Sequence, residues 1–461
     1  MKNMMRKDIR YFMMGVALAA VALSGCSQFE EENLFSESAA QRIVHYNEDL
    51  QARLVEQSSN GNNGWLIQYF VASEYEGFNL FGRFNENGKV TLASDHRFLR
   101  GGNAGNYTED TSFYEMLREE GSVLAFNTWN DVLTVLVDPV SPSDAPKTIL
   151  PDGVGLQGDQ NLVFESNEED GSIMFHGERN LAKVRFVPCD RPWETYIDDT
   201  KDTKKAITNT TITTYYVVCG TDTLYFKNLH KGIITYFDRI EDPMFSSTLT
   251  CVFTPTGFRL QYPDSIADAQ FQEFSLASDK SCLLSEDEKV KVIAMWDYYI
   301  VNSRGTTWNF DQDKLTDEQK SLLALINAEL KKAFDNTFNI TSVGLGKGKT
   351  VASASPGPLI VFDYSYTSKG TKKKSSIGIA VTTSMPTFGQ MVIKVSPDDS
   401  VDSNMDNFFT RSGGSYVESL VRQFAATFDG TYSIVPDDYF LPTGCELRAI
   451  GGGNNYSLKQ P

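Results

Sequence analysis

Short alternating segments separated by turn residues recur along this chain, and they constrain its fold more than any other feature. Phe78–Phe84 and Lys89–Leu92 flank an Asn-Glu-Asn-Gly turn, in which the Asn87-Gly88 pair suits the positive φ angles of a tight hairpin. The same arrangement recurs around Glu168–Gly171 and Thr254–Gly257. Short strands about ten residues apart predict antiparallel meanders rather than a parallel sheet.

Helical periodicity interrupts this pattern in four places. The predicted helices are Ser36 to about Val55, Trp193–Ile207, Thr316–Phe334 and Tyr416–Phe428. In the first, an apolar stripe consists of Ile43, Tyr46, Leu50 and Leu54. In the third, Thr316 and Gln319 have the spacing of a capping box. We therefore expect an α+β, β-rich fold, with antiparallel β-meander, sandwich or barrel-like units that are each preceded by a helix.

A chain of 461 residues is too long for one hydrophobic core, so several domains are expected. The predicted division is 1–25 signal peptide, 26–35 acidic tether, 36–190 helix plus β-meander domain, 191–290 second β-rich unit and 291–461 C-terminal α+β domain.

The N-terminal segment has the parts of a secretory signal. Basic residues precede an uncharged stretch, Tyr11–Leu23, which is too short to span a hydrocarbon core of ~30 Å. Leu23-Ser-Gly-Cys26 follows and resembles a bacterial lipobox, which implies lipid attachment at Cys26. A secretory signal that merely ends at a cysteine is the alternative.

Three acidic residues, Glu30 to Glu32, follow Cys26 closely. They resemble the surface-export signal of Bacteroidetes lipoproteins, and a solvated tether is a compatible interpretation. The expected location is the outer membrane, through an N-terminal lipid anchor and with the protein at the cell surface.

Charge excludes two classes of partner. Without residues 1–25 the chain has 38 basic and 59 acidic residues, a net charge of −21. Such a surface repels nucleic acids and anionic lipid headgroups. The remaining cysteines are few, odd in number and widely spaced, so we expect core residues rather than a disulfide framework. They are Cys189, Cys219, Cys251, Cys282 and Cys445, and one bridge among them is left open.

No motif for a cofactor or a catalytic centre is complete. Gly344–Thr350 resembles part of the phosphate-loop motif G-x-x-x-x-G-K-[ST], but Val343 stands where the motif requires its first glycine. We therefore expect a basic hairpin loop at this segment and no bound nucleotide. The four histidines are far apart, and Pro397–Asn404 lacks the spacing of a calcium loop. A G-x-S-x-G elbow is absent, although a site assembled from distant residues stays open.

Tryptophans give the one hint of ligand binding. Trp65 and Trp129 occur in strand-like contexts and are expected in the core, whereas Trp193 and Trp308 occur in loop-like contexts. Trp193 and Trp308 are therefore the candidate ligand-stacking residues, although structural packing is the favoured interpretation for both.

Several segments together resemble one family. In order they are Asn63–Tyr69, Phe84–Val90, Gly121–Asn130 and Asp138-Pro139. This order resembles the Bacteroidetes lipoproteins of domain of unknown function 4302, from residue 36 to about 285. Such lipoproteins are often encoded beside SusC/SusD-type importers, which implies nutrient capture at the cell surface. The family has no assigned active site, so the resemblance implies no functional residue.

We therefore expect a non-catalytic binding or accessory lipoprotein of a nutrient uptake system, with a glycan or a peptide as ligand. Two alternatives stay open: a hydrolase with a site assembled from distant residues, and a structural adhesin or complex subunit.

Overall fold

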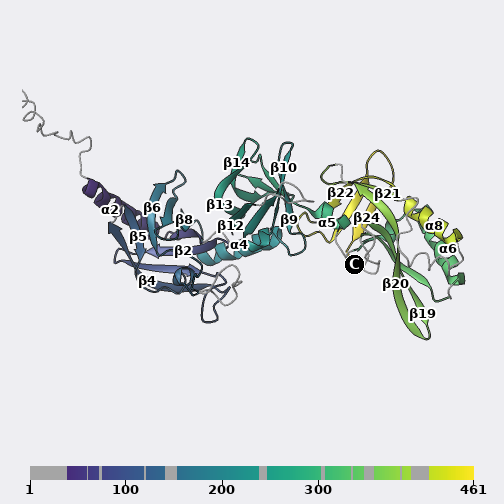
Figure 1. Ribbon diagram of the computed structural model, residues 1–461, viewed down its shortest axis with the longest axis horizontal. Coiled ribbons are helices and arrows are strands. Elements are labelled where there is room, and N and C mark those ends of the chain that lie inside the picture. Colours follow the sequence, from purple (N-terminus) through teal and green to yellow (C-terminus); the bar gives the residue numbers. More distant parts are fainter. Residues whose placement is uncertain are drawn as a thin grey trace, which may run out of the picture.

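Three β-barrels follow one another along the chain. The computed structural model describes residues 39–59, 61–71, 75–118, 121–140, 153–237, 247–302, 307–333, 336–346, 358–384, 387–395 and 415–460. Within these residues the strands form three closed antiparallel barrels of eight strands, arranged in a row (Figure 1). In each barrel successive strands pair, and the first strand also pairs with the last. This confirms the α+β, β-rich fold class in its barrel-like form.

The first barrel is preceded by helix α2 (Ala39–Gln57). Its strands are β1 (Trp65–Phe70), β2 (Phe78–Phe84), β3 (Lys89–Ser94), β4 (Thr108–Arg118), β5 (Ser122–Phe126), β6 (Asn161–Asn167), β7 (Ile173–Gly177) and β8 (Lys183–Pro188), with the short helix α3 (Thr134–Val137) after β5. Leu50 and Leu54 of α2 join the barrel core, whereas Tyr46 is 60% exposed. The expected stripe was wrong at Tyr46, because the buried face of the helix instead includes Asn47, whose amide donates to Leu117 O at 3.1 Å.

The turn between β2 and β3 has four residues. Asn85 N donates to Lys89 O at 2.9 Å, and Gly88 N donates to Asn85 O at 3.1 Å. Gly88 alone has a positive φ, +72°, so the prediction that Asn87 shares this conformation was wrong. The hairpin itself is confirmed by the pairing of β2 with β3.

Aromatic side chains fill the interior of the first barrel. The ring of Phe186 lies 4.8 Å from Phe175, 6.0 Å from Phe84 and 6.1 Å from Trp65, between centroids. All four side chains are fully buried. An eight-stranded barrel is just wide enough for such packing, so this interior is a core.

Helix α4 (Trp193–Ile207) joins the first barrel to the second and has the predicted bounds. Trp193 and Tyr196 pack on Phe81, on the outer wall of the first barrel. Farther along the helix, Thr203 Oγ1 donates to Pro255 O of the second barrel at 2.6 Å.

The second barrel continues past residue 290, where the predicted unit ends. Its strands are β9 (Thr214–Cys219), β10 (Asp222–Lys227), β11 (Ile233–Phe237), β12 (Ser247–Phe253), β13 (Gly257–Ile266), β14 (Ala269–Leu276), β15 (Leu283–Ser285) and β16 (Lys291–Ala294), with a 3-10 turn at Leu229–Lys231. The last strand, β16, is needed for closure because it pairs with β9.

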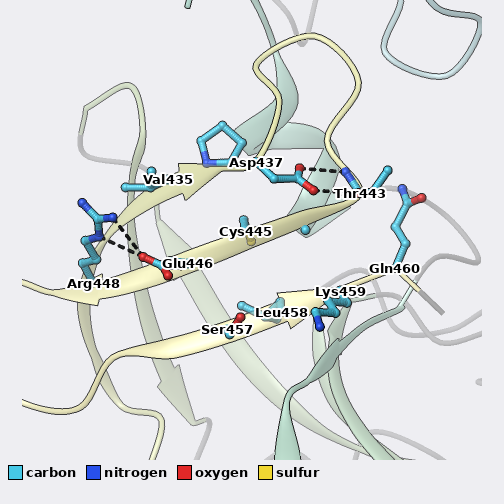
Figure 2. A pocket seen from close by; sticks show the side chains of 12 residues that line it. Val435, Asp437, Thr443, Cys445, Glu446, Arg448, Ser457, Leu458, Lys459 and Gln460 are labelled. Atoms are coloured by element: carbon cyan, nitrogen blue, oxygen red, sulfur yellow. Dashed lines mark hydrogen bonds and ion pairs between the residues drawn. The ribbon is translucent and has the colours of Figure 1, made fainter. Parts of the chain in front are cut away.

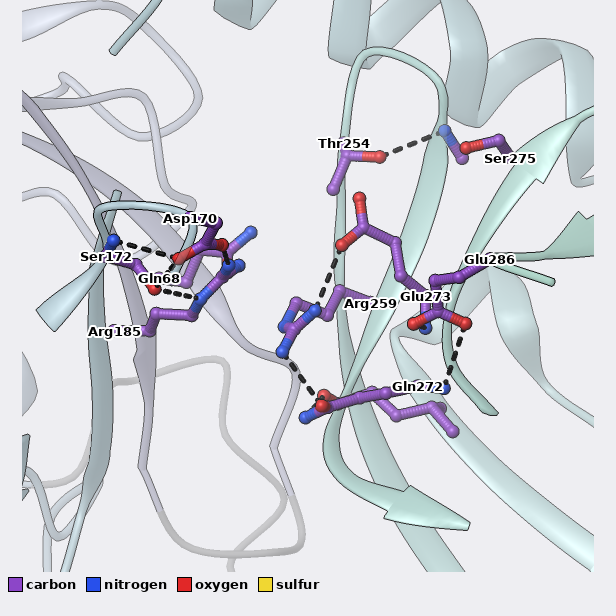
Figure 3. A network of polar contacts seen from close by, with 12 residues as sticks. Gln68, Asp170, Ser172, Arg185, Thr254, Arg259, Gln272, Glu273, Ser275 and Glu286 are labelled. Atoms are coloured by element: carbon purple, nitrogen blue, oxygen red, sulfur yellow. Dashed lines mark hydrogen bonds and ion pairs between the residues drawn. The ribbon is translucent and has the colours of Figure 1, made fainter. Parts of the chain in front are cut away.

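A polar network lies where the first two barrels meet (Figure 3). Arg185 of β8 pairs with Asp170, and Arg259 of β13 pairs with Glu273 at 3.0 Å. Burial, together with the positive charge of Arg185, lowers the pKa of Arg259. Asn79 Nδ2 of the first barrel donates to Phe253 O of the second at 2.8 Å. Direct contacts therefore join the two barrels, in addition to the connection through α4.

The third barrel is accompanied by several helices. Its strands are β17 (Thr307–Phe310), β18 (Asn339–Gly346), β19 (Leu359–Ser368), β20 (Thr371–Ser384), β21 (Gln390–Val395), β22 (Gly430–Pro436), β23 (Gly444–Ala449) and β24 (Tyr456–Lys459); its helices are α5 (Trp296–Asn302), the 3-10 turn Gln312–Lys314, α6 (Asp317–Ala333) and α8 (Ser415–Ala426). α6 follows β17, so it is inserted within the strand order. α6 and α8 pack together at the end of the molecule opposite α2 (Figure 1).

The capping box of α6 is confirmed. Thr316 N donates to Gln319 Oε1 at 3.0 Å, and Gln319 N donates to Thr316 Oγ1 at 3.2 Å. Several other predictions lie outside the described residues: the Ser36 cap, Phe334, the segment 397–404 and the part of 344–350 after Gly346.

Candidate functional site

The predicted signal peptide, the lipidation residue Cys26 and the acidic tether all lie outside the described residues. In the part of the chain that the structure describes, no helix combines the length and the apolar character needed to cross a bilayer.

Trp193 does not lie in an exposed loop. It is the first residue of α4, it is 3% exposed, and its Nε1 donates to Asn63 O at 2.6 Å. Its ring stacks on Phe81, with centroids 5.7 Å apart, and lies 4.1 Å from the guanidinium carbon of Arg83. Trp193 therefore anchors the helix to the first barrel.

Trp308 is also buried, with no exposed surface. It lies in β17, between β18 and β24, and belongs to the core that the second and third barrels share. Strand and helix contacts cover the rings of Trp193 and Trp308, as the favoured interpretation of structural packing predicts, so neither ring is available to stack on a ligand.

Trp129, in contrast to Trp193 and Trp308, is exposed to solvent. It was predicted in the core, yet its side chain is 53% exposed on the first barrel. Strand β5 ends at Phe126, and Trp129 follows in the turn before α3. Its Nε1 donates to Asp131 Oδ1 at 2.6 Å, which fixes the orientation of the indole ring.

Charged groups surround this indole. The guanidinium carbon of Arg100 lies 5.3 Å from the ring centroid of Trp129. Arg100 Nη2 also contacts Asp138 Oδ2 at 2.5 Å. The hydrogen bond from Val140 N, together with that of Arg100, lowers the pKa of Asp138, so this carboxylate is ionised near neutral pH. An exposed indole beside fixed hydrogen-bonding groups is suited to a ligand with an apolar face and a polar edge.

The backbone beneath the indole is held by buried side chains. Asn130 is 1% exposed, and its amide donates to Asp110 O at 3.2 Å and to Ser112 Oγ at 3.1 Å. His96 Nε2 contacts Val132 O at 2.9 Å. The indole therefore projects from a rigid turn. We call Trp129, Arg100, Asp131 and Asp138 the Trp129 surface.

A concave feature lies on the third barrel, beside β22, β23 and β24 (Figure 2). It has a volume of about 690 Å³. Its carboxylates are both engaged, Asp437 by Thr443 and Glu446 by Arg448. Partial burial opposes ionisation of Asp437, but the hydrogen bonds from Thr443 and Gly444 outweigh it and lower the pKa. A carboxylic acid that acts as a general acid at neutral pH needs a raised pKa, which is the opposite of the shift at Asp437.

The described residues contain no group of three His, Cys, Asp or Glu side chains placed to hold a metal ion. All five cysteines of the described chain are free thiols, and four of them are buried.

The signal for Trp129 was present in the sequence. Asn127, Asn130 and Asp131 are turn-forming residues around it, and they end the strand before the indole. The strand ends at Phe126, so its alternation of buried and exposed residues does not reach Trp129.

Comparisons with known proteins give one informative match. A family model, "Domain of unknown function (DUF4302)", matches residues 31–278, which is more than half of the chain. A comparison with proteins of curated function found no match.

Solved structures with some similarity include a sliding clamp and two β subunits of DNA polymerase III, all from bacteria. A clamp from Pseudomonas aeruginosa is 8% identical, with 91% of this chain and 97% of that chain covered and a TM-score of 0.12. The DNA polymerase III β chain from Streptococcus pneumoniae is 11% identical, with 90% and 97% covered and a TM-score of 0.11. The β subunit from Thermotoga maritima is 6% identical, with 90% and 97% covered and a TM-score of 0.12. TM-scores this low carry no argument about this protein. The match that does is the family model, and the chain belongs to the DUF4302 family.

Proposed function

We propose that this protein is a surface-exposed, lipid-anchored outer-membrane protein that binds glycans, without catalysis, as an accessory component of a nutrient uptake system. The Trp129 surface carries the proposal. An indole that is 53% exposed, oriented by Asp131 and flanked by Arg100, offers a flat apolar face beside hydrogen-bonding groups. A pyranose ring has the matching pair of features, an apolar face and a rim of hydroxyl groups.

The barrel interiors support a binding site on the outer surface. Fully buried aromatic side chains fill them, among them Phe186 in the first barrel and Phe258 in the second. A ligand therefore binds outside the barrels, where Trp129 projects.

Calorimetry against a panel of neutral polysaccharides tests the proposal. We expect Trp129→Ala to weaken binding by between about fivefold and 150-fold, because loss of an aromatic contact costs about 1–3 kcal/mol. Tyr262→Ala is the matched control, since Tyr262 is a 44% exposed aromatic residue on the second barrel. Flat titrations across the panel, or equal losses in both variants, would contradict glycan binding at this surface.

The membrane anchor is tested separately. Cys26→Ser should release the protein from the outer-membrane fraction, and protease treatment of intact cells should degrade the wild-type chain if it faces outward.

A pull-down from outer membranes with the tagged wild-type protein tests the uptake role. Recovery of a SusC/SusD-type importer pair is the expected result.

A further inference from the structure

A basic ribbon projects from the third barrel of this acidic protein. Strands β19 and β20 form a hairpin that extends beyond the barrel wall (Figure 1). Its tip carries Lys369, Lys372, Lys373 and Lys374, and residues 364–384 contain no acidic residue, although the chain has 60. We call these four residues the lysine tip.

The outer part of this hairpin has no neighbouring strand among the described residues. β19 pairs with β18 only as far as Ser365, and β20 pairs with β21 only from Val381 to Ser384. Between these limits β19 and β20 pair with each other alone, up to Ser368 and Thr371. Beyond these limits no third strand flanks the ribbon, although Thr367 N donates to Thr337 Oγ1 at 2.7 Å and Tyr366 packs in part against the core. Only the end of the ribbon, Lys369 to Lys374, is exposed.

The lysines lie on both faces of the ribbon. Lys373 pairs with Tyr366, whereas Lys372 pairs with Thr367 and Lys374 with Ser365. Directly paired residues share a face and neighbouring residues alternate, so Lys373 lies beside Tyr366 on one face. The stacked rings of Tyr364 and Tyr366, 6.1 Å apart, continue this face.

The lysine tip is not neutralised within the described chain. Lys372, Lys373 and Lys374 are exposed, and none of the four lysines has an ion pair with a described residue. Lys369 occupies the first position of the Lys369-Gly370 turn with φ +50°. Asn or Gly would adopt this left-handed conformation at lower cost, so Lys369 is not the residue that the turn conformation favours.

We infer that the lysine tip binds an anionic polysaccharide, one that carries carboxylate or sulfate groups. This site is separate from the Trp129 surface of the proposed function, and it would take charged rather than neutral glycans. Separate charges on the two faces suit a flexible polyanion that wraps a narrow ribbon, whereas a flat membrane meets one face. Duplex DNA has a higher charge density, so the acidic body of the protein repels it more strongly. The half-buried ring of Tyr366 lies beside Lys373 on one of these faces.

Binding of the full chain to chondroitin sulfate and polygalacturonate tests the inference. The variant Lys372→Gln/Lys373→Gln/Lys374→Gln should bind at least about tenfold more weakly, and the slope of log Kd against log salt should decrease by about 2 if each lysine meets one anion. The matched control, Lys205→Gln/Lys280→Gln/Lys331→Gln, removes the same charge from exposed sites without ion pairs among the described residues, and it should bind as the wild type does.

Other outcomes overturn the inference. Equal weakening in both triple variants would show a general charge effect. Binding only to anionic vesicles or to duplex DNA would show a different partner. Greater self-association of the tip variant, with unchanged polysaccharide binding, would show that the lysines only protect an exposed strand edge. If neutral glycans bind through Trp129 while the tip variant binds polyanions normally, only the inference about the lysine tip fails. If no glycan binds at all, both this inference and the proposed function fail.

Discussion

The carboxylate of Asp297 accepts a hydrogen bond from the hydroxyl of Tyr216 at 3.4 Å. Tyr216 belongs to the second barrel, and Asp297, at the start of α5, also accepts from Gly389 N of the third barrel at 3.2 Å. This fully buried carboxylate thus joins the two barrels. The adjacent Trp296 packs against Phe388 at the same junction, with ring centroids 5.5 Å apart.

Asp297 should make stability increase in mild acid. Burial raises its pKa above the ordinary value of 3.8, so the folded protein takes up a proton at a higher pH than the unfolded chain. Its contribution to the free energy of unfolding therefore grows as the pH falls through the raised folded pKa, by up to about 1.4 kcal/mol per pH unit, and is lost as the pH rises. Calorimetric unfolding temperatures of the wild type and Asp297→Asn between pH 7 and 4.5 measure this, since Asn does not titrate. Parallel pH profiles for the two proteins would contradict it.

His96 should have the opposite effect. Burial lowers its pKa from 6.5 to about 4, although the contact with Val132 O opposes the shift. Above pH 6.5 the residue is neutral in both states, and below it the unfolded chain takes up the proton first. Stability is therefore lost between pH 6.5 and 4, by about 3 kcal/mol in total. His96→Gln should remove this dependence, which urea unfolding at several pH values would show; an unchanged slope in the variant would refute the assignment.

Asp159 should be needed for the fold of the first barrel. Its carboxylate accepts hydrogen bonds from the backbone N–H groups of Asn180 at 3.0 Å and Ala182 at 3.2 Å, and its own backbone contacts the Tyr69 hydroxyl. Asp159→Ala should cost about 3 kcal/mol, because it leaves backbone donors unpaired in a partly buried turn. The exposed Asp202→Ala is the control and should change stability by less than about 0.5 kcal/mol. Similar unfolding curves for the two variants would exclude this role.

Gln319 should matter more than its capping partner. Beyond the capping box, its Nε2 donates to Thr427 Oγ1 at 2.8 Å and to the Tyr456 hydroxyl at 3.1 Å. Thr316→Ala should cost about 1 kcal/mol, as for loss of an N-cap. Gln319→Glu keeps the capping acceptor but cannot donate, so it should cost more than Thr316→Ala. Chemical denaturation of both variants gives the comparison, and a smaller loss for Gln319→Glu would show that the contacts to Thr427 and Tyr456 contribute little.

Features that depend on neighbouring residues could be predicted from the sequence. The turn at Asn85–Gly88, the helix from Trp193 to Ile207 and the Thr316/Gln319 capping box all involve contacts within a few residues. The candidate site could not be predicted in the same way. The exposure of Trp129 and the burial of Trp193 depend on where a strand ends and on which barrel wall receives a helix.

The sequence by itself determined the β-rich composition of strands and turns, the positions of the main helices and a lipobox-like segment at Cys26. Only the tertiary structure decided that the meanders close into barrels, because closure pairs strands far apart in the chain, such as Trp65 with Pro188. It also decided which tryptophans contact solvent and that the lysine tip stands clear of the acidic body. Local alternation specifies the two faces of a strand, but the packing of distant segments determines whether a given face is covered.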